Sequence, residues 1–253
     1  MNAVRQYFMR FLDLVLTDAL ALRRHKLSRL VPDAWLDWAS WYAGNRDLTV
    51  LSRSQCAQDL YCLFILEKHF GFDPYSDKGT FIEFGGFDGL QHSNSYSLEK
   101  LGWSGLVLEP DSGNFAKCQE NRSCEVVHAA VVGNNGPDTV SFFKDQNDGE
   151  LSHIAGYGTS RAQGAAATEE VKTTTLDALL ARLGQVDILS MDTEGSEADI
   201  VENSNLPVSP RVIVVEHNYH KENRRRIRTR LEALGYVVIA RSGNYFDDYF
   251  VRK

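Results

Sequence analysis

The stretch Phe81-Ile-Glu-Phe-Gly-Gly-Phe-Asp-Gly89 (FIEFGGFDG) places one carboxylate, that of Glu83, inside an apolar run that ends in a glycine cluster. The apolar residues predict a short buried strand. Gly85 and Gly89 predict a turn whose backbone approaches a ligand closely. In open α/β sheets, ligands bind outside the carboxyl ends of the strands. We therefore expect a ligand-binding loop directly after a first strand.

Downstream of this stretch, short apolar strands alternate with helical segments. Strands are expected at 80–84, 104–110, 124–132, 186–192, 211–217 and 236–240, and an edge strand at 246–253. Such alternation predicts an α/β fold with a mainly parallel sheet and helices on both faces. The segment 156–170, GYGTSRAQGAAATEE, is expected to be a loop and is a candidate lid.

Upstream of it, residues 1–78 predict a helical extension, which divides the chain into 1–78 and an α/β domain at 79–253. Residues 4–20 show apolar positions at helical spacing. Arg5, Arg10, Asp13 and Asp18 interrupt the apolar face, which excludes a membrane span or a signal peptide. We expect the extension to serve as a substrate lid or as a homodimer interface. Peripheral contact of its first helix with a membrane surface is a minor alternative.

The composition narrows the function classes. Of 253 residues, 43% are hydrophobic and 24% are charged, as in ordinary globular proteins. The formal net charge of -7 argues against nucleic acid as a partner. The four cysteines show neither a CxxC pair nor zinc-ligand spacing, so we expect idle thiols and a cytoplasmic location.

The glycine pattern distinguishes between cofactors. A dinucleotide fingerprint starting at Gly85 needs glycine at positions 87 and 90, where the chain has Phe87 and Leu90. A nicotinamide-dependent oxidoreductase is therefore disfavoured. The chain has instead an acid, Glu83, before Gly85 and a second acid, Glu109, at the end of the next strand. S-adenosylmethionine fits this arrangement, because it can place its amine beside the first acid and its ribose hydroxyls on the second.

Several segments in order resemble the FkbM family of S-adenosylmethionine-dependent methyltransferases. They are FIEFGGFDGLQHSNSYSLEKLGWSGLVLEPD, NRSC, VKTTTLDALL, VDILSMDTEGSEADIV and VEHNYHKENR, which together run from about residue 80 towards the C-terminus. The resemblance implies a class I methyltransferase (Rossmann-like) fold, whose seven-stranded sheet has an antiparallel last strand. It also implies that 79–253 is the methyltransferase domain. Gly86 and Phe87 depart from the usual family loop, whereas Gly85, Asp88 and Gly89 match it.

The predicted cofactor site combines the loop residues with the ends of neighbouring strands. We expect the adenine to bind a backbone amide near Ala129 and Ala130, because the strand predicted at 124–132 has no acidic side chain at its end. Ser93 and Asn94 are expected to contact the methionine end, or else to cap the following helix. The candidate cofactor residues are Glu83, Gly85, Gly86, Asp88, Gly89, Ser93, Asn94, Glu109, Pro110, Ala130 and Asp192.

A second polar cluster is predicted to be the reaction centre and leaves two interpretations open. In the first, Asp192, Glu216 and His217 bind Mg²⁺ or Mn²⁺, which orients and acidifies a hydroxyl. In the second, no metal binds, and His217 is the general base, oriented by Asp192 or Glu194. Glu194 and Glu197 are alternatively expected only to begin the next helix.

The acceptor is expected to be a small molecule or glycan. Its candidate contacts are Glu150, Ser152, Glu194, Asn218, Tyr219 and Asp247, although Asp247 could instead fix a turn. The resemblance implies an O-methyltransferase that acts on a hydroxyl of a sugar, glycan or glycosylated natural product. The alternative is an inactive protein of the same fold that serves as a binding scaffold. The residues themselves leave acceptor identity, metal dependence and oligomeric state open.

Overall fold

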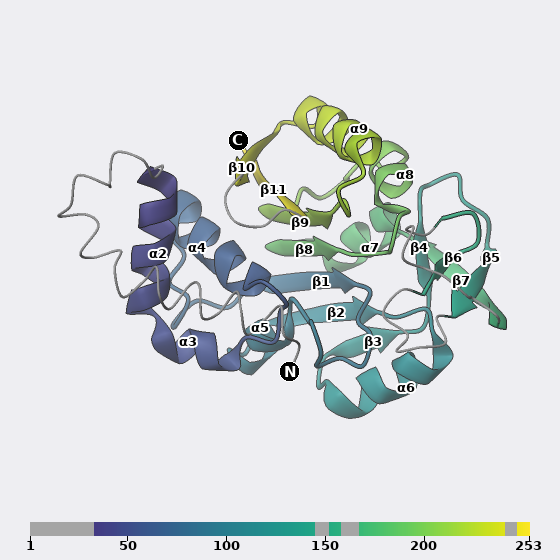
Figure 1. Ribbon diagram of the computed structural model, residues 1–253, viewed down its shortest axis with the longest axis horizontal. Coiled ribbons are helices and arrows are strands. Elements are labelled where there is room, and N and C mark those ends of the chain that lie inside the picture. The colour runs from purple at the N-terminus through teal and green to yellow at the C-terminus, as the bar shows by residue number, and fades with distance from the viewer. Residues whose placement is uncertain (1–32, 145–151, 158–166, 241–246) are drawn as a thin grey trace.

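The computed structural model describes residues 33–144, 152–157, 167–240 and 247–253. Its centre is a seven-stranded sheet in the order β10-β11-β9-β8-β1-β2-β3 (Figure 1). Its strands are β1 (Thr80–Phe84), β2 (Ser104–Leu108), β3 (Glu125–Val127), β8 (Ile188–Met191), β9 (Val212–Glu216), β10 (Tyr236–Ala240) and β11 (Asp247–Arg252). The strand β11 runs antiparallel to both of its neighbours, β10 and β9, and every other pair of neighbours in this sheet is parallel. This topology confirms the predicted class I methyltransferase (Rossmann-like) fold.

Helices cover both faces of the sheet and form a three-layered α/β/α sandwich (Figure 1). Alternate strand residues face opposite layers, as the two-residue period of a strand requires: Phe81 packs in the first layer and Ile82 in the second. The first layer contains α2 (Asp33–Gly44), α4 (Gln58–Phe70), α5 (Tyr96–Lys100) and α6 (Ser112–Asn121). The second contains α7 (Leu176–Leu183), α8 (Glu197–Glu202) and α9 (Lys221–Ala233).

The described part of the N-terminal extension shares its core with the sheet. Leu60, Leu63 and Leu66 of α4 are fully buried. Each such side chain contributes about 1.5–3 kcal/mol on burial. Tyr61 packs edge-on against Tyr249 of β11, with ring centroids 4.8 Å apart. The helical segment before residue 78 and the α/β segment after it therefore share one continuous hydrophobic core. The short helix α3 (Arg46–Leu51) lies beside α2 and α5.

Two strand predictions need correction. The C-terminal strand was expected at an edge, but β11 inserts between β10 and β9. Tyr249, Phe250 and Val251 are consequently buried on both faces of the sheet. The predicted strand 124–132 is divided into β3 and β4 (Ala130–Val132), and β4 joins a second sheet.

This second sheet was not predicted. It has the order β4-β7-β5-β6 and contains β5 (Thr139–Lys144), β6 (His153–Ile154) and β7 (Ala167–Thr175). Because β7 begins at Ala167, the predicted loop 156–170 is shorter than expected at its C-terminal end. The helix expected at 4–20, Glu150 and loop residues 158–166 lie outside the described residues.

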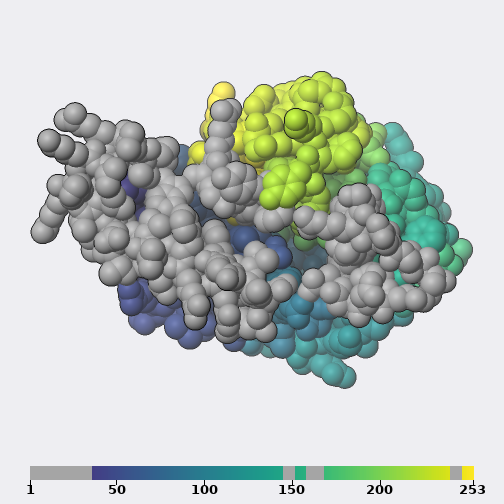
Figure 2. All heavy atoms as spheres, in the orientation of Figure 1, coloured from purple at the N-terminus to yellow at the C-terminus, as the bar shows by residue number. Residues whose placement is uncertain are grey.

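The outer helix α9 lies on the molecular surface, where its yellow-green atoms are visible in Figure 2. Its arginines pair within the protein: Arg224 and Arg228 with Asp248, and Arg226 with Asp199 and Glu202. None of the helices in the described ranges is both long and apolar enough to cross a membrane. The four cysteines are free thiols.

Candidate functional site

A cavity of about 320 Å³ opens at the carboxyl ends of the central strands. Acids line it in the order of the strands: Glu109 follows β2, Glu83 lies in β1, Asp192 follows β8, Glu216 ends β9 and Asp247 begins β11. Five neighbouring strands at a spacing of about 4.8 Å place the first and last acid about 19 Å apart. The cavity therefore has two distinguishable ends along one edge of the sheet.

Glu83 forms a buried network with its own chain. Its carboxylate accepts hydrogen bonds from the hydroxyls of Ser93 and Ser95 and from the backbone N–H of Asn94. Arg122 adds an ion pair at 3.3 Å, and the Arg122 side chain is itself fully buried. Glu83 lines the cavity, but these partners make it first an anchor of the loop that follows β1. Direct capture of a cofactor amine by Glu83 remains a prediction.

The glycines of FIEFGGFDG serve close packing. Gly85 has φ +76°, and a side chain there would collide with the backbone oxygen of Asp192. A side chain at Gly86 would collide with Val107 of β2. Because neither position has room for a side chain, the chain after β1 lies close to both neighbouring strands. Gly85 lines the cavity, whereas Gly86 does not. The sequence predicted a close approach to a ligand, whereas the close contacts at Gly85 and Gly86 are with protein atoms, and approach to a ligand stays a prediction.

Two buried oxygen acceptors at the middle of the cavity lack partners. These are Asn94 Oδ1 and Asp192 Oδ1, for which no hydrogen bond exists among the described residues. The amide nitrogen of Asn94 donates to the Ser190 hydroxyl at 3.0 Å, and this bond aligns the side chain. Leaving a buried acceptor unpaired costs free energy, about 1–3 kcal/mol. Both oxygens therefore suit a ligand that brings N–H donors, such as the ammonium group of S-adenosylmethionine.

Glu109 lies at one end of the cavity and is almost completely buried. Burial raises the pKa of Glu109 to about 8, although backbone N–H donors oppose the shift. These donors are Phe87 at 2.7 Å and Asp111 at 2.8 Å, one on each carboxylate oxygen. Each oxygen keeps a second lone pair, so Glu109 can still accept the two ribose hydroxyls predicted for it.

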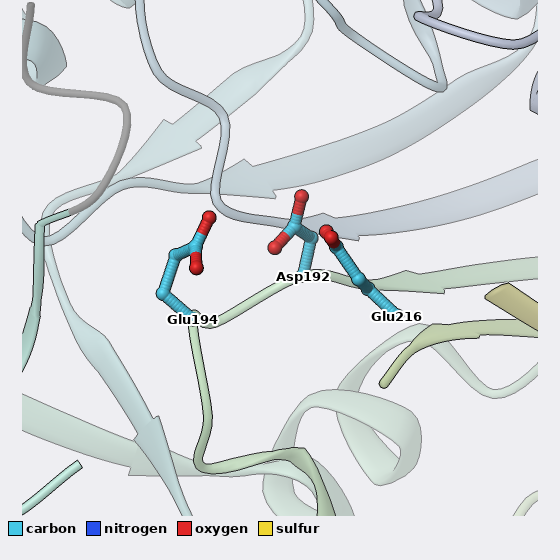
Figure 3. A group of neighbouring side chains, drawn as sticks. All are labelled: Asp192, Glu194 and Glu216. Atoms are coloured by element: carbon cyan, nitrogen blue, oxygen red, sulfur yellow. The ribbon is translucent and has the colours of Figure 1, made fainter. Parts of the chain in front are cut away.

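Three carboxylates converge after β8 and β9. Figure 3 shows Asp192, Glu194 and Glu216 gathered in one place, and one oxygen of each lies within 4.8 Å of the others. Burial, followed by the nearby charge of Asp192, raises the pKa of Glu216 well above its ordinary value. Burial also raises the pKa of Asp192, while a hydrogen bond from Glu216 opposes that rise. The titrations of Asp192 and Glu216 are therefore coupled, and burial together with their mutual repulsion disfavours ionisation of both at once.

His217 does not join this cluster, which corrects its predicted place beside Asp192 and Glu216. It follows β9, but its side chain is buried away from the residues that line the cavity. Its Nδ1 accepts the backbone N–H of Tyr219, and its Nε2 lies 4.0 Å from Asp248. Successive residues of an extended strand point to opposite faces, so Glu216 and His217 separate. Glu194 takes the third position instead.

The other predicted residues divide according to the cavity lining. Residues that line it include Pro110, Ala130, Ser152, Glu194, Asn218 and Asp247. Asp88 and Ser93 do not: Asp88 accepts the backbone N–H groups of Leu90 and Gln91, and Ser93 accepts that of Tyr96 at the start of α5. Gly89 has φ +82° and packs on Arg122 and Cys118. Tyr219 is half-exposed outside the lining.

Sequence reasoning missed several lining residues, among them residues from two segments that were not assigned to the site. Gln55 and Gln58 come from the segment before and at the start of α4, and Phe142 and Ile154 come from the second sheet. The second sheet carried no clear strand signal around residue 153, because β6 contains only two residues. The expectation that Glu197 begins the next helix is confirmed: α8 starts at Glu197, which accepts the backbone N–H groups of Thr193 and Gly195.

Comparison with known proteins adds a family match. The model described as "Methyltransferase FkbM domain" matches residues 83–238, more than half of the chain. No curated protein matches.

Several solved structures are similar to this chain. The precorrin-6y C5,15-methyltransferase of Geobacter metallireducens GS-15 is 14% identical, with 79% of this chain and 88% of that chain covered and a TM-score of 0.41. A human methyltransferase 10 domain containing protein is 13% identical, covering 77% and 80%, also at TM-score 0.41. The SAH-bound Podospora anserina methyltransferase PaMTH1 is 11% identical, covering 88% and 89%, again at 0.41. Likenesses this distant say nothing about the reaction of this chain.

Proposed function

Because the chain belongs to the methyltransferase FkbM domain family, we propose that it transfers the methyl group of S-adenosylmethionine to a hydroxyl oxygen. The acceptor class is a sugar, a glycan or a glycosylated natural product. The observation that supports transfer to oxygen is the cluster of Asp192, Glu194 and Glu216, whose carboxylate oxygens converge within 4.8 Å of one another in the cavity lining. An alkyl hydroxyl is a weak nucleophile and needs activation by a base or a metal. A carboxylate can act as the base or can bind the metal.

The cavity residues fit the cofactor. Glu109 would hold the ribose hydroxyls, and the unpaired Asn94 Oδ1 and Asp192 Oδ1 would accept the methionine ammonium. When bound, S-adenosylmethionine supplies an electrophilic methyl group on a sulfonium. The chain's own part is to hold the acceptor oxygen in line with that methyl group, since positioning supplies much of the acceleration in such a displacement.

Asp192 is the proposed general base. Its Oδ1 would face the ammonium, and its second oxygen, which keeps a lone pair beside the hydrogen bond from Glu216, would face the acceptor hydroxyl. As the acceptor oxygen forms its bond to carbon and the carbon–sulfur bond breaks, Asp192 takes the hydroxyl proton. Asn218 helps to define the site, since its amide donates to Glu194 at 3.2 Å.

A metal-assisted reaction is the second candidate, favoured by the same cluster. Asp192, Glu194 and Glu216 offer three oxygen ligands within 4.8 Å of one another, the ligand type that Mg²⁺ and Mn²⁺ prefer. These oxygens would hold the cation, which would supply Lewis-acid activation of the acceptor hydroxyl. Glu194 takes the place earlier given to His217 in this set.

The test is transfer of a labelled methyl group from S-adenosylmethionine to a set of glycosides, after EDTA treatment and again with Mg²⁺ or Mn²⁺. We expect transfer to a hydroxyl, and loss of that transfer in Asp192→Asn. Activity that disappears with EDTA and returns with Mg²⁺ selects the metal-assisted reaction, whereas activity unaffected by EDTA selects the general base. Cofactor binding without transfer to any hydroxyl would contradict the proposal and favour a binding scaffold.

A further inference from the structure

We propose that the N-terminal extension builds the acceptor subsite through Gln55 and Gln58, and that this subsite selects an uncharged polyhydroxyl ring over an anionic one. The inference rests on the proposed function, because it concerns the acceptor end of the same cavity. It adds a specificity-determining role for a segment that lies outside the matched family region.

The strand order shows which end of the cavity is left for the acceptor. Glu109 after β2 and the Asn94–Asp192 acceptors near β1 and β8 account for the ribose and methionine parts of the cofactor. The remaining end lies beyond β8, at β9 and β11, where Glu216 and Asp247 are paired neighbours. Gln55 and Gln58 line the same cavity as these two acids.

Gln58 bridges the extension and the last strand. Its amide nitrogen donates to Asp247 at 3.1 Å, and its amide oxygen accepts the backbone N–H of Cys56 at 2.8 Å. Both Gln58 and Asp247 are nearly fully buried. These two bonds fix the amide orientation, and the nitrogen retains a second N–H for another acceptor. A hydroxyl group, which both donates and accepts, is a suitable partner for a neighbouring amide and carboxylate.

A buried anchor holds this segment in place. Asp59 is completely buried and accepts the hydroxyls of Ser52, Ser54 and Ser97 together with the backbone N–H of Leu60. Ala57 has φ +60°, an unusual conformation for a residue with a side chain, where the chain turns into α4. Ser54 also bridges His92, another lining residue. Gln55 and Gln58 are thus presented by a rigid turn.

The composition of the described lining disfavours anionic acceptors. The described lining residues include six carboxylates, those of Glu83, Glu109, Asp192, Glu194, Glu216 and Asp247, and neither lysine nor arginine. A phosphate, sulfate or uronic acid at this end would meet a lining rich in acidic groups, in which His92 is the one basic side chain among the described residues, and such like-charge contact costs several kcal/mol. Neutral rings with hydroxyl groups meet amides and acceptor oxygens instead.

The experiment compares methyl glucoside, methyl galactoside and methyl mannoside with their uronic-acid counterparts in the labelled transfer assay. We expect transfer to neutral members, with kcat/KM for each uronic acid at least about 100-fold lower. Gln55→Ala and Gln58→Met should raise KM for the neutral acceptor about 10-fold, the loss expected for one or two hydrogen bonds. Their affinity for S-adenosylhomocysteine should remain within a factor of two, which a general loss of structure would not allow.

A charge-introducing variant sharpens the test. Gln55→Lys should gain transfer to the uronic acids, whereas the matched Gln119→Lys, on the exposed surface of α6 outside the lining, should not. Equal use of neutral and anionic glycosides, or unchanged selectivity in Gln55→Lys, would overturn the inference. So would binding of S-adenosylhomocysteine without transfer to any neutral glycoside. Failure to bind S-adenosylhomocysteine at all would instead contradict the proposed function.

Discussion

Glu83 in β1 and Asp192 directly after β8 come from neighbouring strands and both line the cavity, yet their environments differ. Glu83 is bound by two serine hydroxyls, a backbone N–H and the buried Arg122. Asp192 keeps one buried oxygen unpaired and lies in hydrogen-bond contact with Glu216. An acid whose acceptors are satisfied by its own chain holds the fold together. An acid whose acceptor is left open is available to a ligand.

The largest expected effect concerns Asp192, the acid with an unpaired oxygen. Asp192→Asn should lower kcat by as much as about 10⁴-fold, because an amide cannot take the hydroxyl proton. Its melting temperature should change little, since the substitution removes a charge that burial disfavours. Steady-state methyl transfer and thermal unfolding would be measured on the same preparation. Near-normal kcat in Asp192→Asn would remove Asp192 from the reaction centre.

The next largest effect concerns Glu83, the acid whose oxygens are bound by its own chain. Glu83→Gln should lower the free energy of unfolding by about 3 kcal/mol, because the buried Arg122 loses one of its two carboxylate partners. Urea denaturation measures this loss. Arg182→Gln is the matched control, since the ion pair of Arg182 with Glu125 is half-exposed and should contribute at most about 1 kcal/mol. Similar losses in the two variants would show that Glu83 is not an anchor.

A third prediction concerns Asp248, the acid of the sheet that is most strongly paired outside the cavity. Burial alone would raise its pKa, but hydrogen bonds from Arg224 and Arg228 lower the pKa of Asp248 to about 2. The ionised form is therefore favoured by folding, and its contribution is fully present above the ordinary pKa of 3.8 and is lost as the pH falls towards 2. Asp248→Asn should cost about 2 kcal/mol at neutral pH. The difference from wild type should vanish near pH 2, and a difference that persists there would contradict this account.

The smallest expected effect concerns His217. Because His217 lies beside Asp248 and outside the cavity lining, His217→Asn should lower kcat by much less than the factor of about 10² that a general base supplies. The pH profile of the transfer should keep its shape. A loss of 10² or more with an altered profile would restore the catalytic role predicted for His217 from the sequence.

The sequence predicted the strands well where apolar runs were bounded by turns. It predicted β1, β2, β8, β9 and β10, as well as the family match, from ordered motifs. It did not predict that β11 lies inside the sheet, because strand order depends on contacts between distant segments. The division of 124–132 into β3 and β4 was missed for the same reason, since β4 pairs with β7 about forty residues later.

The sequence predicted which residues lie near the candidate site better than it predicted the direction in which their side chains point. Strand ends identified Glu83, Glu109, Asp192 and Glu216 because carboxyl ends of parallel strands share one edge. Which side chain faces the cavity depends on the local turn. Asn218 and Tyr219 both have positive φ, so the chain after β9 leaves the extended conformation. Gln55 and Gln58 reach the cavity only through tertiary packing of α4, which no local pattern reveals.

The central claim is that the edge lined by Glu109, Asn94 and Asp192 binds the cofactor. Calorimetric titration of S-adenosylhomocysteine into wild type, Glu109→Gln and the control Asp248→Asn tests it most directly. Since the pKa of Glu109 is about 8 and ribose hydroxyls prefer its ionised form, wild-type affinity should rise between pH 6 and pH 8. Glu109→Gln should bind about tenfold more weakly without this pH dependence, and Asp248→Asn should bind like wild type. No binding by wild type, or equal binding by Glu109→Gln at every pH, would contradict the claim.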